Sequence, residues 1–130
     1  MTRGQIAIIT DNKIYTSNEF NGDMYMSNGL GRTVTNGLKR VKDIADYQYF
    51  VAKFNKEHHH YNDLEHIMYE QSQEALDFNS DYFDKWFSDY IYIKNIGTTP
   101  KTINASNGTY NLAPNQIARL CFGRLEKISE

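Results

Sequence analysis

Short runs of apolar, β-branched and aromatic residues lie at both ends of the chain and predict β-strands there. At the N-terminal end, residues 4–10 and 14–17 form two such runs, and Asp11-Asn12-Lys13 predicts the hairpin turn between them. The C-terminal third holds further runs at residues 90–96, 101–105, 109–112, 116–122 and 123–128. Asn107-Gly108 supplies the residues that a tight turn favours. This pattern predicts an antiparallel sheet, in which the N-terminal hairpin and a C-terminal meander share one core.

Apolar positions at helical spacing fill the middle of the chain. One stripe predicts a helix over residues 33–44: Val34, Leu38, Val41 and Ile44. Residues 46–58 fit a helix or a strand, and we favour a helix because the helical pattern continues through the second half. Residues 64–70 predict a short strand. Ser80 is expected to cap a short helix over residues 81–88, which carries several aromatic side chains.

Length, charge and cysteine content narrow the class of protein. At 130 residues and 15.2 kDa, the chain is expected to be a single α+β ligand-binding domain, residues 1–130, with two or three helices packed on the sheet. The net charge of −2 argues against a nucleic-acid polymer as partner. The single Cys121 allows neither an internal disulfide nor a cysteine zinc cluster. We find no signal segment and no apolar run of membrane-spanning length, so we expect a cytoplasmic protein without a membrane partner.

The stretch from Ser17 to Arg32 has the composition of an anion-binding loop. Glycine and asparagine tolerate left-handed backbone, so a loop containing Asn21, Gly22 and Gly31 can turn tightly and expose N–H groups. The start of the following helix adds unpaired N–H groups and a positive dipole end. Arg32 supplies a guanidinium for a bidentate pair with phosphate. A long surface loop capped by a helix remains the plain alternative.

Other candidate ligand contacts lie in the last third of the chain. Arg119 and Arg124 fall on the final strand and its extension, and Arg119 needs an anion or a carboxylate partner if it faces inward. Trp86 is a candidate for stacking on a base, although core packing is the ordinary role of such a ring. Asn95 has the donor and acceptor groups to read polar edges of a ribose or base.

Motifs for catalysis, cofactors and metals are missing or incomplete. The glycine loop lacks Walker spacing, and Val34 stands where a dinucleotide fingerprint needs glycine or alanine. The histidines at 58–60 point in different directions on an extended loop and do not make a ligand cage. Glu19 and Asp23 form at best a weak acid–base signal. We therefore predict no enzyme activity, no cofactor and no metal.

The order of these features resembles the first Thoeris anti-defence family, small phage-encoded sponges of immune signals. The resemblance is carried by the opening Thr2-Arg3-Gly4, the segment Glu19-Phe20-Asn21-Gly22-Asp23, Gly31-Arg32, Trp86-Phe87 before residues 90–95, and the arginine-bearing last strand. It implies a non-catalytic binder that sequesters cyclic ADP-ribose-type signals, and in some members cyclic oligonucleotides, and so blocks bacterial anti-phage defence.

The resemblance also implies an assembly and a set of contacts. Family members form homo-oligomers, dimers or hexamers built from dimers, with pockets at or near subunit interfaces, and release their ligand intact on denaturation. Arg32 and Arg119 would contact phosphates, whereas Trp86 and Asn95 would contact the base and ribose. Two other hypotheses remain open. One is a protein-binding inhibitor of a host enzyme, and the other is a small hydrolase that uses Thr2 or the Glu19/Asp23 pair.

Overall fold

The computed structural model of the protein is an α+β fold with one large sheet. It describes residues 3–17, 19–21, 29–58, 75–85 and 89–128. The large sheet contains β1 (Arg3–Ile9), β2 (Lys13–Thr16), β3 (Phe20–Asn21), β4 (Leu76–Asp77), β5 (Tyr90–Asn95), β8 (Ile117–Cys121) and β9 (Arg124–Lys127). The strand order is β4-β2-β1-β5-β8-β9, with β3 paired to the start of β1. A separate hairpin consists of β6 (Lys101–Ala105) and β7 (Gly108–Leu112).

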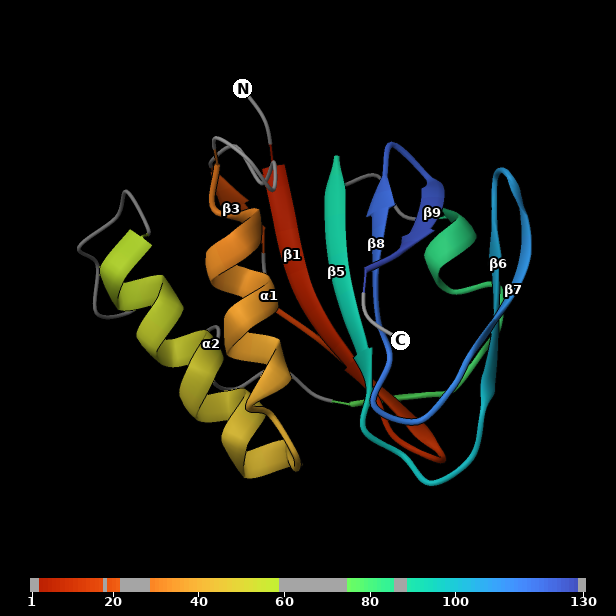
Figure 1. Cartoon of the computed structure of the whole chain (residues 1–130), viewed down its shortest axis with the longest axis horizontal. Helices are drawn as coiled ribbons and strands as arrows, with labels where there is room; N and C mark the ends of the chain where they lie inside the picture. Colours follow the sequence, from red (N-terminus) through yellow and green to blue (C-terminus); the bar gives the residue numbers. More distant parts are fainter. Residues whose placement is uncertain (1–2, 18, 22–28, 59–74, 86–88, 129–130) are drawn as a thin grey trace.

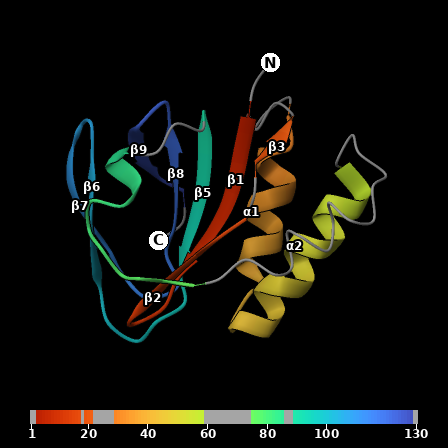
Figure 2. The ribbon, with the colours of Figure 1, turned by 180° about the vertical axis from the view of Figure 1, so that it is seen from behind.

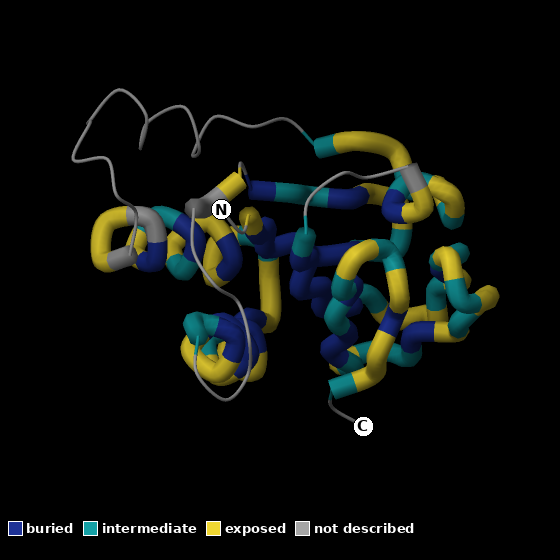
Figure 3. The backbone as a smooth tube through the Cα atoms, turned by 90° about the horizontal axis from the view of Figure 1, so that it is seen from above, coloured by how far each residue is buried: buried dark blue, intermediate teal, exposed yellow. Residues whose placement is uncertain are grey.

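Three layers enclose two cores. The helices α1 (Gly31–Lys39) and α2 (Ile44–His58) cover one face of the sheet, and the β6–β7 hairpin covers the other (Figure 1). The reverse view shows the same arrangement (Figure 2). Strand alternation divides the side chains: Ile6, Ile8, Tyr90 and Tyr92 pack toward the helices, whereas Ala7, Ile9, Ile91 and Ile93 pack toward the hairpin. Buried segments gather in the interior when the molecule is viewed from above (Figure 3).

The pairing of β1 with β5 differs from the predicted antiparallel sheet. These two strands run parallel, with Gly4 opposite Tyr90 and Ile9 opposite Asn95, while the other strand pairs are antiparallel in the part of the sheet that the structure describes. A parallel pair needs a long crossover connection, and the chain between β1 and β5 contains both α-helices. Both strands are buried along almost their whole length, which explains their continuous apolar sequences.

The predicted C-terminal meander is also divided. β8 pairs directly with β5, and β6–β7 leaves the large sheet to form its own two-stranded sheet. The reason lies in the alternation of the hairpin, which buries Ile103 and Leu112 and exposes Thr102 and Asn111. Such strands have one apolar face and can cover a core, whereas β8 has the more continuous apolar sequence of an interior strand.

The helices agree with prediction in position but not in every boundary. The prediction of a helix over residues 46–58 is confirmed by α2, but α1 ends at Lys39 although the apolar stripe continues to Ile44. Over residues 81–85, the described part of the helix expected at 81–88, the structure has a 3-10 turn at Phe83–Lys85. The N–H of Asp81 bonds Asn79 rather than a Ser80 cap. The predicted strand at 64–70 lies outside the described residues. No described helix has the length and apolarity to cross a membrane.

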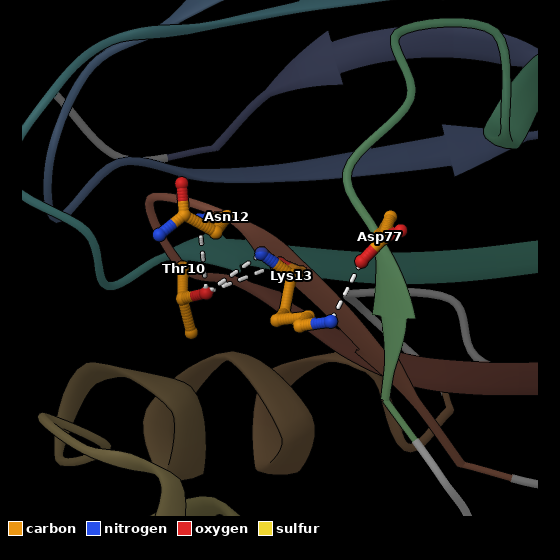
Figure 4. A network of polar contacts seen from close by, with 4 residues as sticks. All are labelled: Thr10, Asn12, Lys13 and Asp77. Atoms are coloured by element: carbon orange, nitrogen blue, oxygen red, sulfur yellow. Dashed lines mark hydrogen bonds and ion pairs between the residues drawn. The ribbon is translucent and has the colours of Figure 1, made fainter.

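The first hairpin turn is held by side chains (Figure 4). The hydroxyl of Thr10 accepts hydrogen bonds from the N–H of Asn12 (3.4 Å) and of Lys13 (2.9 Å). Nζ of Lys13 lies 2.6 Å from Oδ1 of Asp77 and so joins β2 to β4. This contact raises the pKa of Lys13 and lowers that of Asp77, because each charge stabilises the other.

Candidate functional site

A groove of about 460 Å³ lies between α1 and α2. Its α1 side and the turn that follows consist of Thr33, Asn36, Gly37, Arg40 and Val41, and its α2 side consists of Asp46, Tyr49, Phe50, Lys53, Phe54 and Glu57. Residues on each helix recur at intervals of three and four, which places them along one stripe of that helix. The volume falls within the range of small-molecule sites.

The floor of the groove is made where the two helices approach each other. A Cβ added to Gly37 would lie 2.2 Å from a ring carbon of Phe50, so only glycine leaves room for this ring. The rings of Phe50 and Phe54 meet edge to face with centroids 6.0 Å apart. An aromatic floor at a glycine contact gives the groove an apolar base beneath polar walls.

The charged side chains on the walls of the groove differ in the partners that they contact. Oδ2 of Asp46 accepts the N–H of Lys42 at 3.0 Å, and Glu57 makes an interaction of its own. Arg40 and Lys53 are exposed and make no ion pair with any residue that the structure describes. The ring of Tyr49 is 71% exposed at the rim. The groove lining therefore combines two cations without an ion pair to a described residue, two carboxylates and an exposed aromatic ring. The cations and the ring are the groups that suit an anionic ligand with a flat ring.

The predicted loop contributes less to this groove than expected. Gly31 is the buried first residue of α1, and Arg32 follows it as an exposed residue outside the groove lining. Leu30 precedes the helix without a side-chain cap, and the first turn carries no acidic residue. Asn21 is placed only by its backbone pairing with Arg3, and Gly22 lies outside the described residues. The phosphate role of this loop stays a prediction.

Asn95 is buried and holds two turns together. Its Nδ2 donates to the carbonyls of Thr99 (3.0 Å) and Leu112 (2.9 Å), and its Oδ1 accepts the N–H of Gly97 at 2.9 Å. These bonds use both sides of the amide. A ligand contact by Asn95 stays a prediction, and it requires some of these bonds to open.

Arg119 faces the helix side of the sheet and finds a carboxylate within its own hairpin. Its Nη2 lies 2.5 Å from Oε2 of Glu126, and its guanidinium lies 5.9 Å from the ring centre of Tyr90. Burial opposes its charge, but hydrogen bonds with Tyr92 and Glu126 outweigh burial and raise the pKa. Burial also raises the pKa of Tyr92. Nε of Arg119 is buried without a hydrogen-bond partner among the described groups.

Among the residues that the structure describes, the other predicted contacts are not placed in a common site with Arg119. Arg124 is exposed on β9 opposite Cys121, and neither Arg119 nor Arg124 lines the groove between the helices. Trp86 lies outside the described residues. The structure therefore brings Arg119 next to Glu126 and Tyr92, and it does not bring Arg119 and Arg32 into one described contact.

The residues of the alternative hypotheses are only partly placed. Glu19 is exposed and pairs with Arg3 at 3.6 Å, whereas Thr2, Asp23 and residues 59–74 lie outside the described part of the chain. Within the described residues, no group of three or more histidine, cysteine, aspartate or glutamate side chains is arranged to hold a metal.

Sequence reasoning missed the groove residues, although two signals pointed to them. Gly37 interrupts a helix where alanine would be favoured, which indicates a close helix contact. Tyr49 falls between the buried Tyr47 and Val51, off the apolar side of α2. Both observations become informative only once the two helices are placed side by side. Comparison with family models, with curated proteins and with solved structures gives no match for this chain.

Proposed function

We propose that the protein binds and retains a small anionic ligand with an aromatic ring, of the cyclic-nucleotide signal class, without cleaving it. The observation that carries the proposal is the groove between α1 and α2, where Arg40, Lys53 and the exposed ring of Tyr49 surround an apolar floor. A hydrogen bond to a charged group contributes about 1.5–3 kcal/mol, and base stacking about 1–3 kcal/mol. Two cations and one ring together contribute about 4–9 kcal/mol before the cost of association is subtracted.

The biological role follows from the ligand class. A binder that holds a cyclic ADP-ribose isomer or a cyclic oligonucleotide lowers the free concentration of an immune signal and blocks the defence that depends on it. The proposal includes a cytoplasmic location in the host cell and a homo-oligomer, either a dimer or a hexamer built from dimers. Native mass spectrometry of the purified protein measures the subunit number and any retained ligand together.

Retention of an intact ligand is tested by binding and heat release. The protein is mixed with cyclic ADP-ribose isomers and cyclic oligonucleotides, filtered to remove free ligand, heated, and the released compounds are measured by mass spectrometry. We expect one compound to be retained before heating and recovered unchanged afterwards. It should also raise the melting temperature with the logarithm of its concentration once that concentration exceeds Kd. Recovery of a hydrolysed product would support the hydrolase hypothesis instead.

A second candidate function, docking of an amphipathic helix from a host protein, is favoured by the shape of the groove. Its lining residues follow two helical stripes, and an elongated groove between two helices is a common site for a third helix. This candidate predicts a stable complex with a macromolecule and no melting shift with any nucleotide. The same filtration experiment therefore distinguishes the two.

A further inference from the structure

Lys94 is a buried cation in the middle of the fold. It lies on β5, is 4% exposed, and has the uncharged Ile8 and Ile117 as its neighbours on the adjacent strands. Its Nζ donates to the carbonyl of Val41 at 2.6 Å and approaches the carbonyl of Lys39 at 3.4 Å. A buried ammonium is costly unless it is paired or hydrogen-bonded, so these carbonyls account for its position.

The carbonyls that bind Lys94 belong to Lys39, the last residue of α1, and to Val41 in the turn that follows the helix. The last carbonyls of a helix lack partners within the helix and must find them elsewhere. Here the N–H of Arg40 bonds the carbonyl of Gly37, and the N–H of Val41 bonds the carbonyl of Leu38, both at 3.1 Å. Lys94 supplies a donor beyond these two bonds, and its positive charge opposes the negative end of the helix dipole.

The start of α2 is tied to the same corner. The N–H of Asp46 donates to Oδ1 of Asp43 at 2.7 Å, and the N–H of Lys42 donates to Oδ2 of Asp46 at 3.0 Å. Burial lowers the pKa of Lys94 and the charge of Lys42 lowers it further, whereas Asp46 acts in the opposite direction. Residues 39–46 thus form one hydrogen-bonded corner, and Arg40, Val41 and Asp46 within it line the groove.

We infer that Lys94 is a positioning residue for the groove, which fixes the end of α1 and thereby places Arg40 across from Lys53. The inference rests on the proposed function for its effect on ligand binding. Lys94 itself does not line the groove, so its influence passes through the carbonyls of Lys39 and Val41. Loss of the ammonium leaves the end of α1 without its donor on β5 and releases the wall that carries Arg40.

The test compares Lys94→Met with Lys56→Met, which removes an exposed lysine of α2 outside the groove lining and outside this corner. With cyclic ADP-ribose as the probe, we expect Lys94→Met to weaken binding at least tenfold and Lys56→Met to leave it within twofold. Lys94→Arg retains a cationic donor and should recover most of the affinity. Equal affinities for Lys94→Met and the wild type would overturn the inference.

Hydrogen exchange separates this inference from the proposed function. Without any ligand, the amides of residues 40–42 should exchange at least tenfold faster in Lys94→Met, while β1 and β5 keep their protection. If the wild type binds none of the cyclic ADP-ribose isomers and cyclic oligonucleotides, the proposed function fails, and this measurement still decides the role of Lys94. Should Lys94→Met not fold, Lys94→Gln, which keeps a neutral donor in place of the ammonium, replaces it in the same measurement. Unchanged protection at residues 40–42 in that variant contradicts the inference.

Discussion

Polar side chains on the sheet and polar side chains in the groove between the helices differ in burial and in bonding partners. Asn95 and Arg119 are largely buried and bonded to neighbours within the fold. Arg40 and Lys53 are exposed, and no described residue forms an ion pair with either. The comparison teaches that a polar side chain in an apolar sequence indicates a need for a partner, but it does not say whether that partner is a ligand or the protein itself.

The largest effect is expected from Asn95→Ala, which removes a buried polar side chain from the sheet. Three hydrogen bonds are lost and buried backbone groups are left without partners, so the free energy of unfolding should fall by about 3 kcal/mol or more. Urea unfolding measures the change. The matched control Asn111→Ala removes an exposed amide and should cost less than about 0.5 kcal/mol. A small effect at both positions would mean that Asn95 is free for ligand contact.

Tyr49→Ala tests the contribution of one groove side chain to ligand binding without disturbing the fold. The ring is mostly exposed, so stability should change little, while ligand affinity should fall by about 1–3 kcal/mol through lost stacking. Tyr49→Phe retains the ring and should bind like the wild type. Titration calorimetry measures both variants, and equal binding by Tyr49→Ala would remove this ring from the site.

Glu126→Ala tests whether Arg119 depends on an internal partner. The side chain of Arg119 is only 14% exposed, while that of Glu126 is 56% exposed. Because solvent screens the carboxylate, we expect a loss of about 1–2 kcal/mol, less than for a fully buried pair. Glu126→Gln keeps a hydrogen-bond acceptor, so its free energy of unfolding should fall by less. Unchanged unfolding of Glu126→Ala would show that the pair contributes nothing measurable.

A smaller contribution, which disappears in acid, is expected from Asp11. Its pKa is held at about 2, below the usual 3.8, by hydrogen bonds from the side chains and N–H groups of Thr98 and Thr99. The charged form is favoured in the folded state, so its contribution is present above pH 3.8 and is lost as the pH falls toward 2. Melting temperatures measured across this range should fall less steeply for Asp11→Asn than for the wild type. The exposed Asp84→Asn serves as control, and parallel curves for all three proteins would contradict the assignment.

Strands and helices were predictable because their signals are local. Ile6 to Ile9 and Tyr90 to Asn95 are apolar runs whose strand character does not depend on what they pair with. Their parallel pairing was not predictable in the same way, because it depends on how the two helices between them fold back. The turn after α1 likewise bonds Lys94, which is more than fifty residues away in the sequence.

The candidate site was harder to predict for the same physical reason. Arg119 was expected to need an anion if it faced inward, and its position opposite Glu126 in the β8–β9 hairpin supplies one. Arg40 and Lys53 carried no such signal, because a charge on a helix is ordinarily solvated. The packing of Phe50 on Gly37 brings the walls of the groove together, and that contact joins two different elements.

The most direct test of the groove compares two double variants with equal loss of charge. Arg40→Ala/Lys53→Ala removes both cations from the groove, whereas Lys39→Ala/Lys56→Ala removes two exposed lysines from the same helices outside it. Calorimetric titration with the compound recovered after heat release should show at least a hundredfold loss of affinity for the first variant, about 3 kcal/mol, and less than a threefold loss for the second. Equal losses in the two variants, or no loss in either, would contradict binding in the groove between α1 and α2.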